Sequence, residues 1–355
     1  MSKPHILIIG GGIIGASLAW HGVRAGARVT VVEAATVGGR ATRDSWAWIN
    51  ATAGNPEPYF RLRVQSMAEW RALEKSVSGV DVDWSGGLLF DMPAEDLKPF
   101  AAQHMAWGYD IRLIDQAEAA TLEPQLAHPP ECAVFAPCEG SVDAVAVTLA
   151  MLAAAQSAGA EVIENTPVRA LVVKDGRVTG AETAVGVIAA DHVIVASGIT
   201  VKDIAATAGV DVPMTASPGL LISSTPTDRI LNGLVMSLGC HVRQLADGRL
   251  LAGADYGGSV VGDDVTDEAF AVFEVMKALF KSGDALEMGT YSLGQRPMPD
   301  DGLPIVGTVD TVDGLSVAIL HSGVTLAPVV GRLTIDEIIS DNRDPLMAPF
   351  GLDRF

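Results

Sequence analysis

Alternating apolar and polar stretches at the start of the chain predict a strand, a helix and a second strand. Residues 6–9 are apolar, as expected of a buried strand, and residues 28–32 form a second β-type run that leads into Glu33. Between them, Gly10, Gly12 and Gly15 open a stretch that is compatible with a helix. This pattern is typical of a β-α-β unit with a glycine-rich first turn.

Helical and strand patterns alternate along the rest of the chain. Apolar residues at helical spacing predict an amphipathic helix over residues 59–77, and the alanine-rich residues 143–158 predict a helix that Gly159 ends. Between about 82 and 137 the pattern changes to short strands and turns, with one short helix before Pro124. Further strands are predicted over 161–163, 167–173, 192–196, 217–260 (β-rich) and 315–320, and further helices over 269–280 and after Gly323.

Length, charge and cysteine content narrow the class of protein. The chain has 355 residues, more than one hydrophobic core usually serves, and this predicts two domains. Its net charge of -19 disfavours nucleic acid and anionic membranes as partners. The apolar start is too short to cross a bilayer and lacks the basic start and cleavage site of a secretory signal. Three cysteines without a CxxC pair fit a reducing compartment, so we expect a cytoplasmic protein.

The glycine turn has the chemistry of a dinucleotide site. Gly10 allows the tight turn, Gly12 lets the backbone approach a pyrophosphate, and Gly15 lets the helix pack close to the strand. The helix N-terminus offers N–H groups and a partial positive charge to the diphosphate. Glu33, about twenty residues downstream, can accept hydrogen bonds from ribose hydroxyls and repels a 2′-phosphate, which disfavours NADP.

Four motifs in order along the chain resemble those of the FAD-dependent amine oxidoreductases of the D-amino-acid oxidase, glycine oxidase and sarcosine oxidase family. They are GGGIIG followed by Glu33, VIVASG in mid-chain, GQRPMPDDGLPIVG, and HSGVTLAP near the C-terminus. The resemblance implies an α/β fold (α+β overall), with a Rossmann-like FAD-binding domain and an inserted, mostly antiparallel β-sheet substrate domain. The FAD-binding domain is expected over residues 1–80, 141–215 and 295–355, and the substrate-binding domain over 81–140 and 216–294.

The same resemblance implies noncovalent FAD, because no cysteine follows Cys240, whereas monomeric sarcosine oxidases tether the flavin through a cysteine in this region. Residues 40–42 are expected at the pyrophosphate, Ala47 and Trp48 at the isoalloxazine, and Val168 at the adenine. A helix that starts at Gly323 is expected to direct its positive end at the flavin pyrimidine, where negative charge gathers in the reduced form. The full set of expected FAD contacts is Gly10, Gly12, Ile13, Ile14, Gly15, Glu33, Arg40, Ala41, Thr42, Ala47, Trp48, Val168, Ser197, Gly198, Ser322, Gly323, Val324, Thr325 and Leu326.

Arg296 is the residue that we expect to bind the substrate, because the family places an arginine here that grips the substrate carboxylate. A planar guanidinium forms two parallel hydrogen bonds to a carboxylate, which fixes the α-carbon over the flavin N5. The alternative for Arg296 is a surface position or an ion pair with Asp300 or Asp301. The other expected catalytic residues are Tyr256, His241 and His321, although a histidine in a strand is more often a core or surface group.

The resemblance implies oxidation of a small amino acid or N-alkyl amino acid, without a metal ion. A hydride passes from the α-carbon to FAD, and the imine is hydrolysed to a 2-oxo acid and an amine. Oxygen or an electron carrier then reoxidises the flavin. Two alternatives stay open: an FAD-dependent 2-hydroxy-acid dehydrogenase, with His241 or His321 as base, and an FAD-binding subunit of a heteromeric amine dehydrogenase. A homo-oligomer is equally compatible with the sequence.

Overall fold

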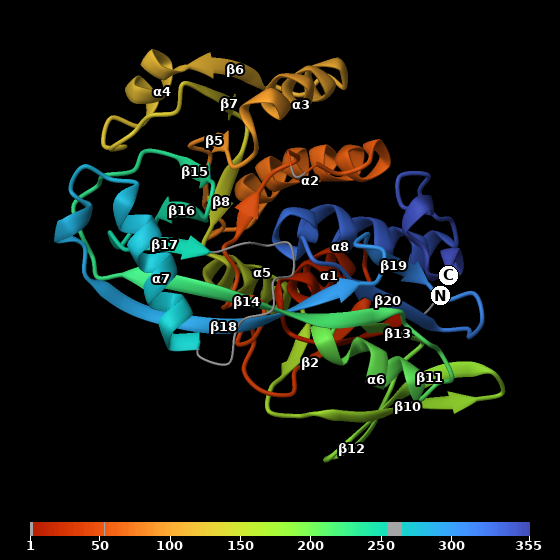
Figure 1. The fold of residues 1–355 in the computed structure, drawn as a ribbon. Helices are drawn as coiled ribbons and strands as arrows, with labels where there is room; N and C mark the ends of the chain where they lie inside the picture. The colour runs from red at the N-terminus through yellow and green to blue at the C-terminus, as the bar shows by residue number, and fades with distance from the viewer. Residues whose placement is uncertain (1–2, 53, 254–264) are drawn as a thin grey trace.

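A six-stranded sheet lies at the centre of the computed structural model, which describes residues 3–52, 54–253 and 265–355 (Figure 1). Five neighbouring strands run parallel, and only β19 is antiparallel to its neighbour β20. The strand order is β19 (Ile305–Thr308), β20 (Leu315–Ile319), β13 (His192–Val195), β1 (His5–Ile9), β2 (Arg28–Val32) and β9 (Glu161–Ile163). The strands predicted over 6–9, 28–32, 161–163, 192–196 and 315–320 are therefore confirmed.

Apolar side chains on both faces of this sheet are buried, as expected of parallel strands. On β1, Ile6 and Ile8 pack toward a layer of helices, whereas Leu7 and Ile9 pack toward a small antiparallel sheet on the other face. The helices are α1 (Ile13–Arg24), α5 (Ala144–Ser157) and α8 (Gly323–Ser340). The opposite face carries β10 (Val168–Lys174), β11 (Arg177–Thr183), β12 (Gly186–Ala189) and α6 (Val201–Ala206). Together these layers form a Rossmann-like unit.

A second sheet of eight strands extends away from the first (Figure 1). Every pair in it is antiparallel except β15 with β5, which confirms the mostly antiparallel character expected. The order is β18 (Met288–Pro299), β14 (Met214–Ser224), β17 (Leu250–Gly253), β16 (Cys240–Gln244), β15 (Leu234–Ser237), β5 (Gly87–Phe90), β7 (Cys132–Ala136) and β6 (Arg112–Asp115). The helices α7 (Val265–Ala278) and α4 (Gln116–Leu122) pack on this sheet.

Helix α2 (Glu57–Ser76) packs against α8 (Figure 1). Its Trp70 is fully buried, and the indole N–H donates to the carbonyls of Val324 and Thr325, both at 3.1 Å. A three-stranded sheet lies beside it, formed by β3 (Trp48–Ile49), β8 (Gly140–Val142) and β4 (Val82–Asp83). Short 3₁₀ turns complete the described elements: η1 (Gly198–Thr200), η2 (Gly283–Ala285), η3 (Ala348–Phe350) and η4 (Leu352–Arg354).

One helix contradicts the prediction of short strands and turns between 82 and 137. Helix α3 covers Ala94–Ala106 and contains Pro99, a residue that usually argues against a helix interior. Its buried residues Leu97, Ala101 and His104 follow helical spacing and supply the apolar face. Packing of this face overrides the low intrinsic helix propensity of proline.

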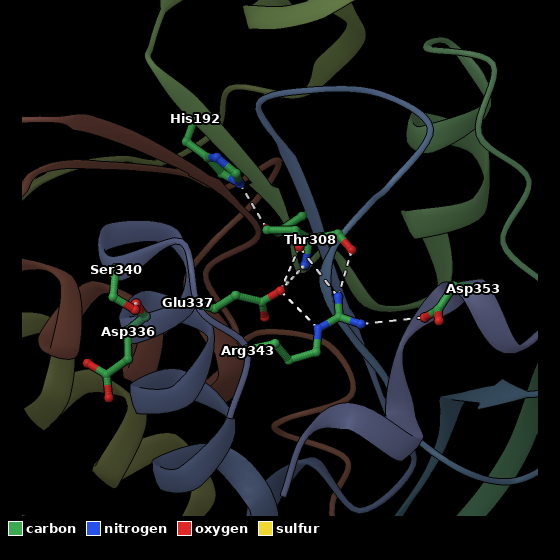
Figure 2. Close-up of polar contacts among 8 residues, drawn as sticks. His192, Thr308, Asp336, Glu337, Ser340, Arg343 and Asp353 are labelled. Atoms are coloured by element: carbon green, nitrogen blue, oxygen red, sulfur yellow. Dashed lines mark hydrogen bonds and ion pairs between the residues drawn. The ribbon is translucent and has the colours of Figure 1, made fainter. Parts of the chain in front are cut away.

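A polar cluster fixes the C-terminal half of α8 to β19 (Figure 2). Glu337 is 5% exposed and accepts hydrogen bonds from the Thr308 hydroxyl at 2.6 Å and from Arg343 Nε at 3.0 Å. Arg343 also donates to the Thr308 carbonyl at 3.0 Å and lies 3.4 Å from Asp353. Because this end of α8 is held to the sheet, the position of its N-terminus is fixed as well.

Among the helices of the described ranges, none combines the length and the apolar character that a membrane-spanning helix needs.

Candidate functional site

Two cavities meet at the N-terminus of α8. The smaller, of about 410 Å³, lies at the carboxyl ends of β1, β2 and β13, where open α/β sheets bind their ligands. The larger, of about 600 Å³, lies between residues 41–52, the start of α2 and the paired strands β14 and β18. The residues that line both cavities are Ala41, Ser45, Pro297, His321, Gly323 and Val324. A long ligand can therefore extend from one cavity into the other.

The smaller cavity is shaped by the glycine turn. Gly10 has φ +112°, and a Cβ there would lie 2.5 Å from the Ala196 carbonyl oxygen. A Cβ on Gly15 would lie 1.9 Å from the Gly10 oxygen, so the helix can approach the strand only with glycine at this position. A Cβ on Gly12 would reach within 3.1 Å of Thr42 Oγ1 and narrow the space above the turn. The tight turn at Gly10 and the close helix packing at Gly15 therefore require glycine, whereas the approach of a pyrophosphate to Gly12 stays a prediction.

Polar groups around this turn fit a dinucleotide. At the N-terminus of α1 the Ile13 N–H donates to Thr42 Oγ1 at 3.1 Å, and the first turn has no acidic residue, which suits an anionic diphosphate. The Glu33 carboxylate accepts the N–H groups of Gly11 at 2.8 Å and Ala35 at 2.9 Å. These bonds orient the carboxylate, and each oxygen keeps a second lone pair for a ribose hydroxyl. The residues present therefore fit the adenosine half of FAD.

Most of the expected FAD contacts line the two cavities. The smaller cavity includes Gly10, Gly12, Ile13, Ile14, Glu33, Arg40, Thr42, Val168, Ser197 and Gly198, the larger includes Ala47, Trp48, Ser322 and Thr325, and Ala41, Gly323 and Val324 line both. Leu326 and Gly15 line neither. Leu326 is fully buried, and its N–H donates to the Ser322 carbonyl at 3.1 Å, so the structure does not bring it to the site.

Arg296 lines the larger cavity, and its role in substrate binding stays a prediction. It lies on β18 opposite Ser217 of β14, and its Nη2 donates to the Pro218 carbonyl. Among the described residues no ion pair joins it to Asp300 or Asp301, and Asp301 instead pairs with Arg354 at 2.8 Å. The alternative of an ion pair with the following loop is therefore wrong.

The two candidate histidines also line the larger cavity. His241 Nε2 lies 3.1 Å from Asp91 Oδ2, and its ring centroid lies 5.8 Å from that of Trp46. Burial, strengthened by the charges of Arg296 and Arg63, lowers the pKa of His321 to about 4, so its imidazole is neutral at physiological pH. Tyr256 lies outside the described residues.

Arg63 was not expected in the site. Its side chain lines the larger cavity and is 2% exposed. The guanidinium donates to the Asn50 carbonyl at 3.0 Å, to Asn50 Oδ1 at 2.6 Å and to Ser322 Oγ at 2.6 Å. A signal was present in the sequence, because residue 63 falls on the apolar stripe of the predicted helix, between Phe60 and Met67.

Glu139 is a second buried charge that sequence reasoning missed. It is fully buried and accepts hydrogen bonds from the Thr52 hydroxyl at 2.7 Å, the Tyr109 hydroxyl at 2.8 Å and the Trp48 indole N–H at 3.0 Å. The N–H groups of Ala51 and Thr52 also donate to it, at 3.1 and 3.2 Å. Burial raises the pKa of this carboxyl to about 6, and the donors oppose the rise. Glu139 thereby holds the 47–52 segment, most of which lines the larger cavity.

The described residues contain no cluster of metal-ligating side chains. The larger cavity instead combines two arginines, a histidine–aspartate pair and several aromatic rings beside the helix N-terminus. Such a set of groups can bind an anionic substrate and an aromatic cofactor ring.

Comparisons with known proteins find similarity over nearly the full length of the chain. A family model described as "DAO: FAD dependent oxidoreductase" matches residues 5–337. Glycine oxidase from Geobacillus kaustophilus is 27% identical over 369 residues, which cover 98% of this chain and 96% of the relative. The crystal structure of glycine oxidase from Geobacillus kaustophilus has a TM-score of 0.89 at 25% identity and covers 99% of this chain and 100% of that one. An opine oxidase subunit from Agrobacterium tumefaciens is 24% identical over 381 residues, covering 100% of this chain and 98% of the relative.

Proposed function

The chain belongs to the DAO family of FAD-dependent oxidoreductases, and from this premise we propose that it oxidises a small amino acid or N-alkyl amino acid whose carboxylate binds Arg296. It is an FAD-dependent oxidoreductase of the glycine oxidase type. The observation that carries the finer proposal is the junction of the two cavities, because a dinucleotide turn at one end leads to an arginine-lined chamber at the other.

The proposed placement of FAD follows the cavities. Its adenosine half occupies the smaller cavity, and the isoalloxazine crosses the junction with its pyrimidine edge at the N-terminus of α8. Binding is noncovalent, a proposal supported by the cavity linings, which include no cysteine among the described residues. The two sheets support the proposed division into an FAD-binding domain (1–80, 141–215 and 295–355) and a substrate-binding domain (81–140 and 216–294).

The residues of the larger cavity suit the oxidation of an amine. Bound FAD supplies an acceptor for a hydride. Arg296 holds the substrate carboxylate by paired hydrogen bonds, which orients the α-carbon. His321 is neutral at physiological pH, so it adds no positive charge that would repel the substrate amine. Loss of a hydride from the α-carbon of the neutral amine leaves an iminium ion, which becomes the imine when a proton leaves its nitrogen. Water then converts the imine to a 2-oxo acid and ammonia or an alkylamine.

Two observations favour alternative functions. The pair of His241 and Asp91 in the larger cavity suits a general base for a 2-hydroxy acid, because the carboxylate can orient the imidazole. The similarity to an opine oxidase subunit favours the second alternative, an FAD-binding subunit of a heteromeric amine dehydrogenase. The three free cysteines support a cytoplasmic location.

The visible spectrum of the FAD-loaded protein under anaerobic conditions tests the proposal. Glycine, N-methylglycine, proline and pooled D-amino acids are added separately, and 2-hydroxy acids are added in parallel. Bleaching of the flavin band by amino acids supports the proposal. Bleaching by 2-hydroxy acids alone replaces it with the first alternative, and reduction that appears only with a copurified partner replaces it with the second.

A further inference from the structure

Arg63 is a buried cation whose close partners are all neutral. Its three hydrogen bonds go to two oxygens of Asn50 and to the Ser322 hydroxyl, at 2.6–3.0 Å. A guanidinium stays charged under all physiological conditions. Burying such a charge is unfavourable by several kcal/mol unless an anion or a set of dipoles compensates it.

No carboxylate among the described residues forms an ion pair with this guanidinium. Glu139 is close enough for the Arg63 charge to lower the pKa of its carboxyl. However, five donors from other residues already occupy the Glu139 oxygens. The described residues of the site therefore provide no bonded anion for Arg63, although its side chain lines the larger cavity.

The position of Arg63 indicates which ligand supplies the anion. Its Nη1 bonds Ser322, the residue that precedes the first turn of α8. That turn has no side-chain cap and no acidic residue, and it lies where the two cavities join. A ligand edge that faces the positive end of α8 therefore also faces Arg63, whereas Arg296 approaches from the paired strands β14 and β18.

We propose that the Arg63 guanidinium and the N-terminus of α8 together form a cationic site for the negatively charged pyrimidine edge of reduced FAD. Arg63 is thus an electrostatic residue for the cofactor, and Arg296 serves the substrate. This inference rests on the proposed placement of the flavin ring. A hydride transferred from substrate to flavin brings two electrons and one proton, and the remaining negative charge gathers at N1 and the C2 carbonyl. A fixed cation there favours the reduced form over the oxidised form.

The test measures the cofactor without turnover. The two-electron midpoint potential of bound FAD is determined for the wild type and for Arg63→Met, together with the dissociation constant for sulfite, which attacks oxidised flavin at N5 and leaves negative charge at N1. In Arg63→Met we expect a potential lower by about 30 mV, which is a tenfold change for a two-electron couple, and sulfite binding weaker by about the same factor. Arg63→Lys, which keeps the charge, should remain near the wild type.

A second variant separates the charge from the structural role of Arg63. Asn50→Asp places a carboxylate where Oδ1 now accepts the 2.6 Å bond, so Arg63 stays in place while its charge is neutralised. We expect the same direction of change as in Arg63→Met, and this variant decides the question if Arg63→Met fails to bind FAD. Arg61→Met is the matched control, because Arg61 lies on the same helix and pairs with Glu57 at the surface at 2.8 Å.

An unchanged potential and unchanged sulfite binding in FAD-loaded Arg63→Met or Asn50→Asp would overturn the inference. Weaker binding of carboxylate ligands at an unchanged potential would also overturn it, because Arg63 would then serve the substrate. A wild-type protein that takes up no FAD would refute the proposed function and this inference with it, whereas unchanged FAD-loaded variants refute this inference alone.

Discussion

Replacement of Arg296 by methionine tests the assignment of the substrate carboxylate. Methionine keeps much of the length of the side chain and removes the guanidinium. The Arg296 guanidinium faces the larger cavity from β18. The Arg296 side chain packs over Gly219, where an added Cβ would lie 3.0 Å from Arg296 Nε. Its Nη2 donates to the Pro218 carbonyl and to the Ser217 hydroxyl, which fixes the orientation of the fork.

The expected loss follows from the hydrogen bonds that the variant cannot make. Each hydrogen bond to a charged group contributes about 1.5–3 kcal/mol, so a bidentate pair contributes about 3 kcal/mol or more. Since about 1.4 kcal/mol is a tenfold change in rate, kcat/KM for a carboxylate substrate should fall on the order of 100-fold or more. Arg296→Lys keeps the charge without the fork and should fall between the two.

The assay compares each amino acid with the corresponding amine that lacks the carboxylate, under anaerobic flavin reduction. Arg296→Met should lose activity toward the amino acid only, and it should retain FAD at the wild-type ratio. Arg249→Met is the control, because Arg249 pairs with Asp247 at 2.8 Å and lines neither of the two joined cavities. Equal losses for both substrates, or no loss for either, would refute the reasoning.

Three further predictions concern stability. Glu139→Ala leaves several buried donors without an acceptor, so the free energy of unfolding in urea should fall by about 3 kcal/mol or more. FAD should also bind more weakly. A variant with the stability of the wild type would contradict the role of this buried network. Arg343→Met leaves the Glu337 carboxylate, 5% exposed, without its cation, and we expect a loss of about 2 kcal/mol by the same measurement. Burial lowers the pKa of His21 and His192 from 6.5 to about 4, so the unfolded chain binds protons between these values that the folded chain does not. Stability should therefore be full above pH 6.5 and decrease toward pH 5 by about 2 kcal/mol for each of the two histidines, and His192→Asn should remove about half of that loss.

The glycine turn and its acidic partner could be predicted because they lie close together in the chain. Gly10, Gly12 and Glu33 lie within one β-α-β unit, so strand pairing and helix geometry place them together without reference to the rest of the chain. The apolar residues of this unit follow the strand and helix patterns clearly, and the ends of β1 and β2 agree with the prediction to within one residue.

Other features depend on contacts that periodicity does not encode. Helix α3 escaped prediction because Pro99 masks its apolar face, which is stabilised by packing on the second sheet and on Phe60 of α2. Asp91 follows a strand as an ordinary turn residue would, and its partner His241 is 150 residues away. The contact between Arg63 and Ser322 joins positions 259 apart in the chain. An arginine on an apolar helix stripe indicates that a partner exists, but only the fold identifies that partner.

The buried charges of Glu139 and Arg63 both form hydrogen bonds with the 47–52 segment, one as an acceptor and the other as a donor. Glu139 accepts hydrogen bonds from Trp48, Ala51 and Thr52, whereas Arg63 donates to Asn50 between them. Buried ionic groups seldom add stability over apolar packing, so their presence here favours a role in fixing the cavity and its field. The roles can be separated experimentally. Loss of Glu139 should weaken FAD binding by releasing the 47–52 segment, whereas neutralisation of Arg63 by Asn50→Asp should lower the potential of FAD that is still bound. If both changes altered only FAD affinity, the two charges would share a single structural function, and the electrostatic role of Arg63 would be wrong.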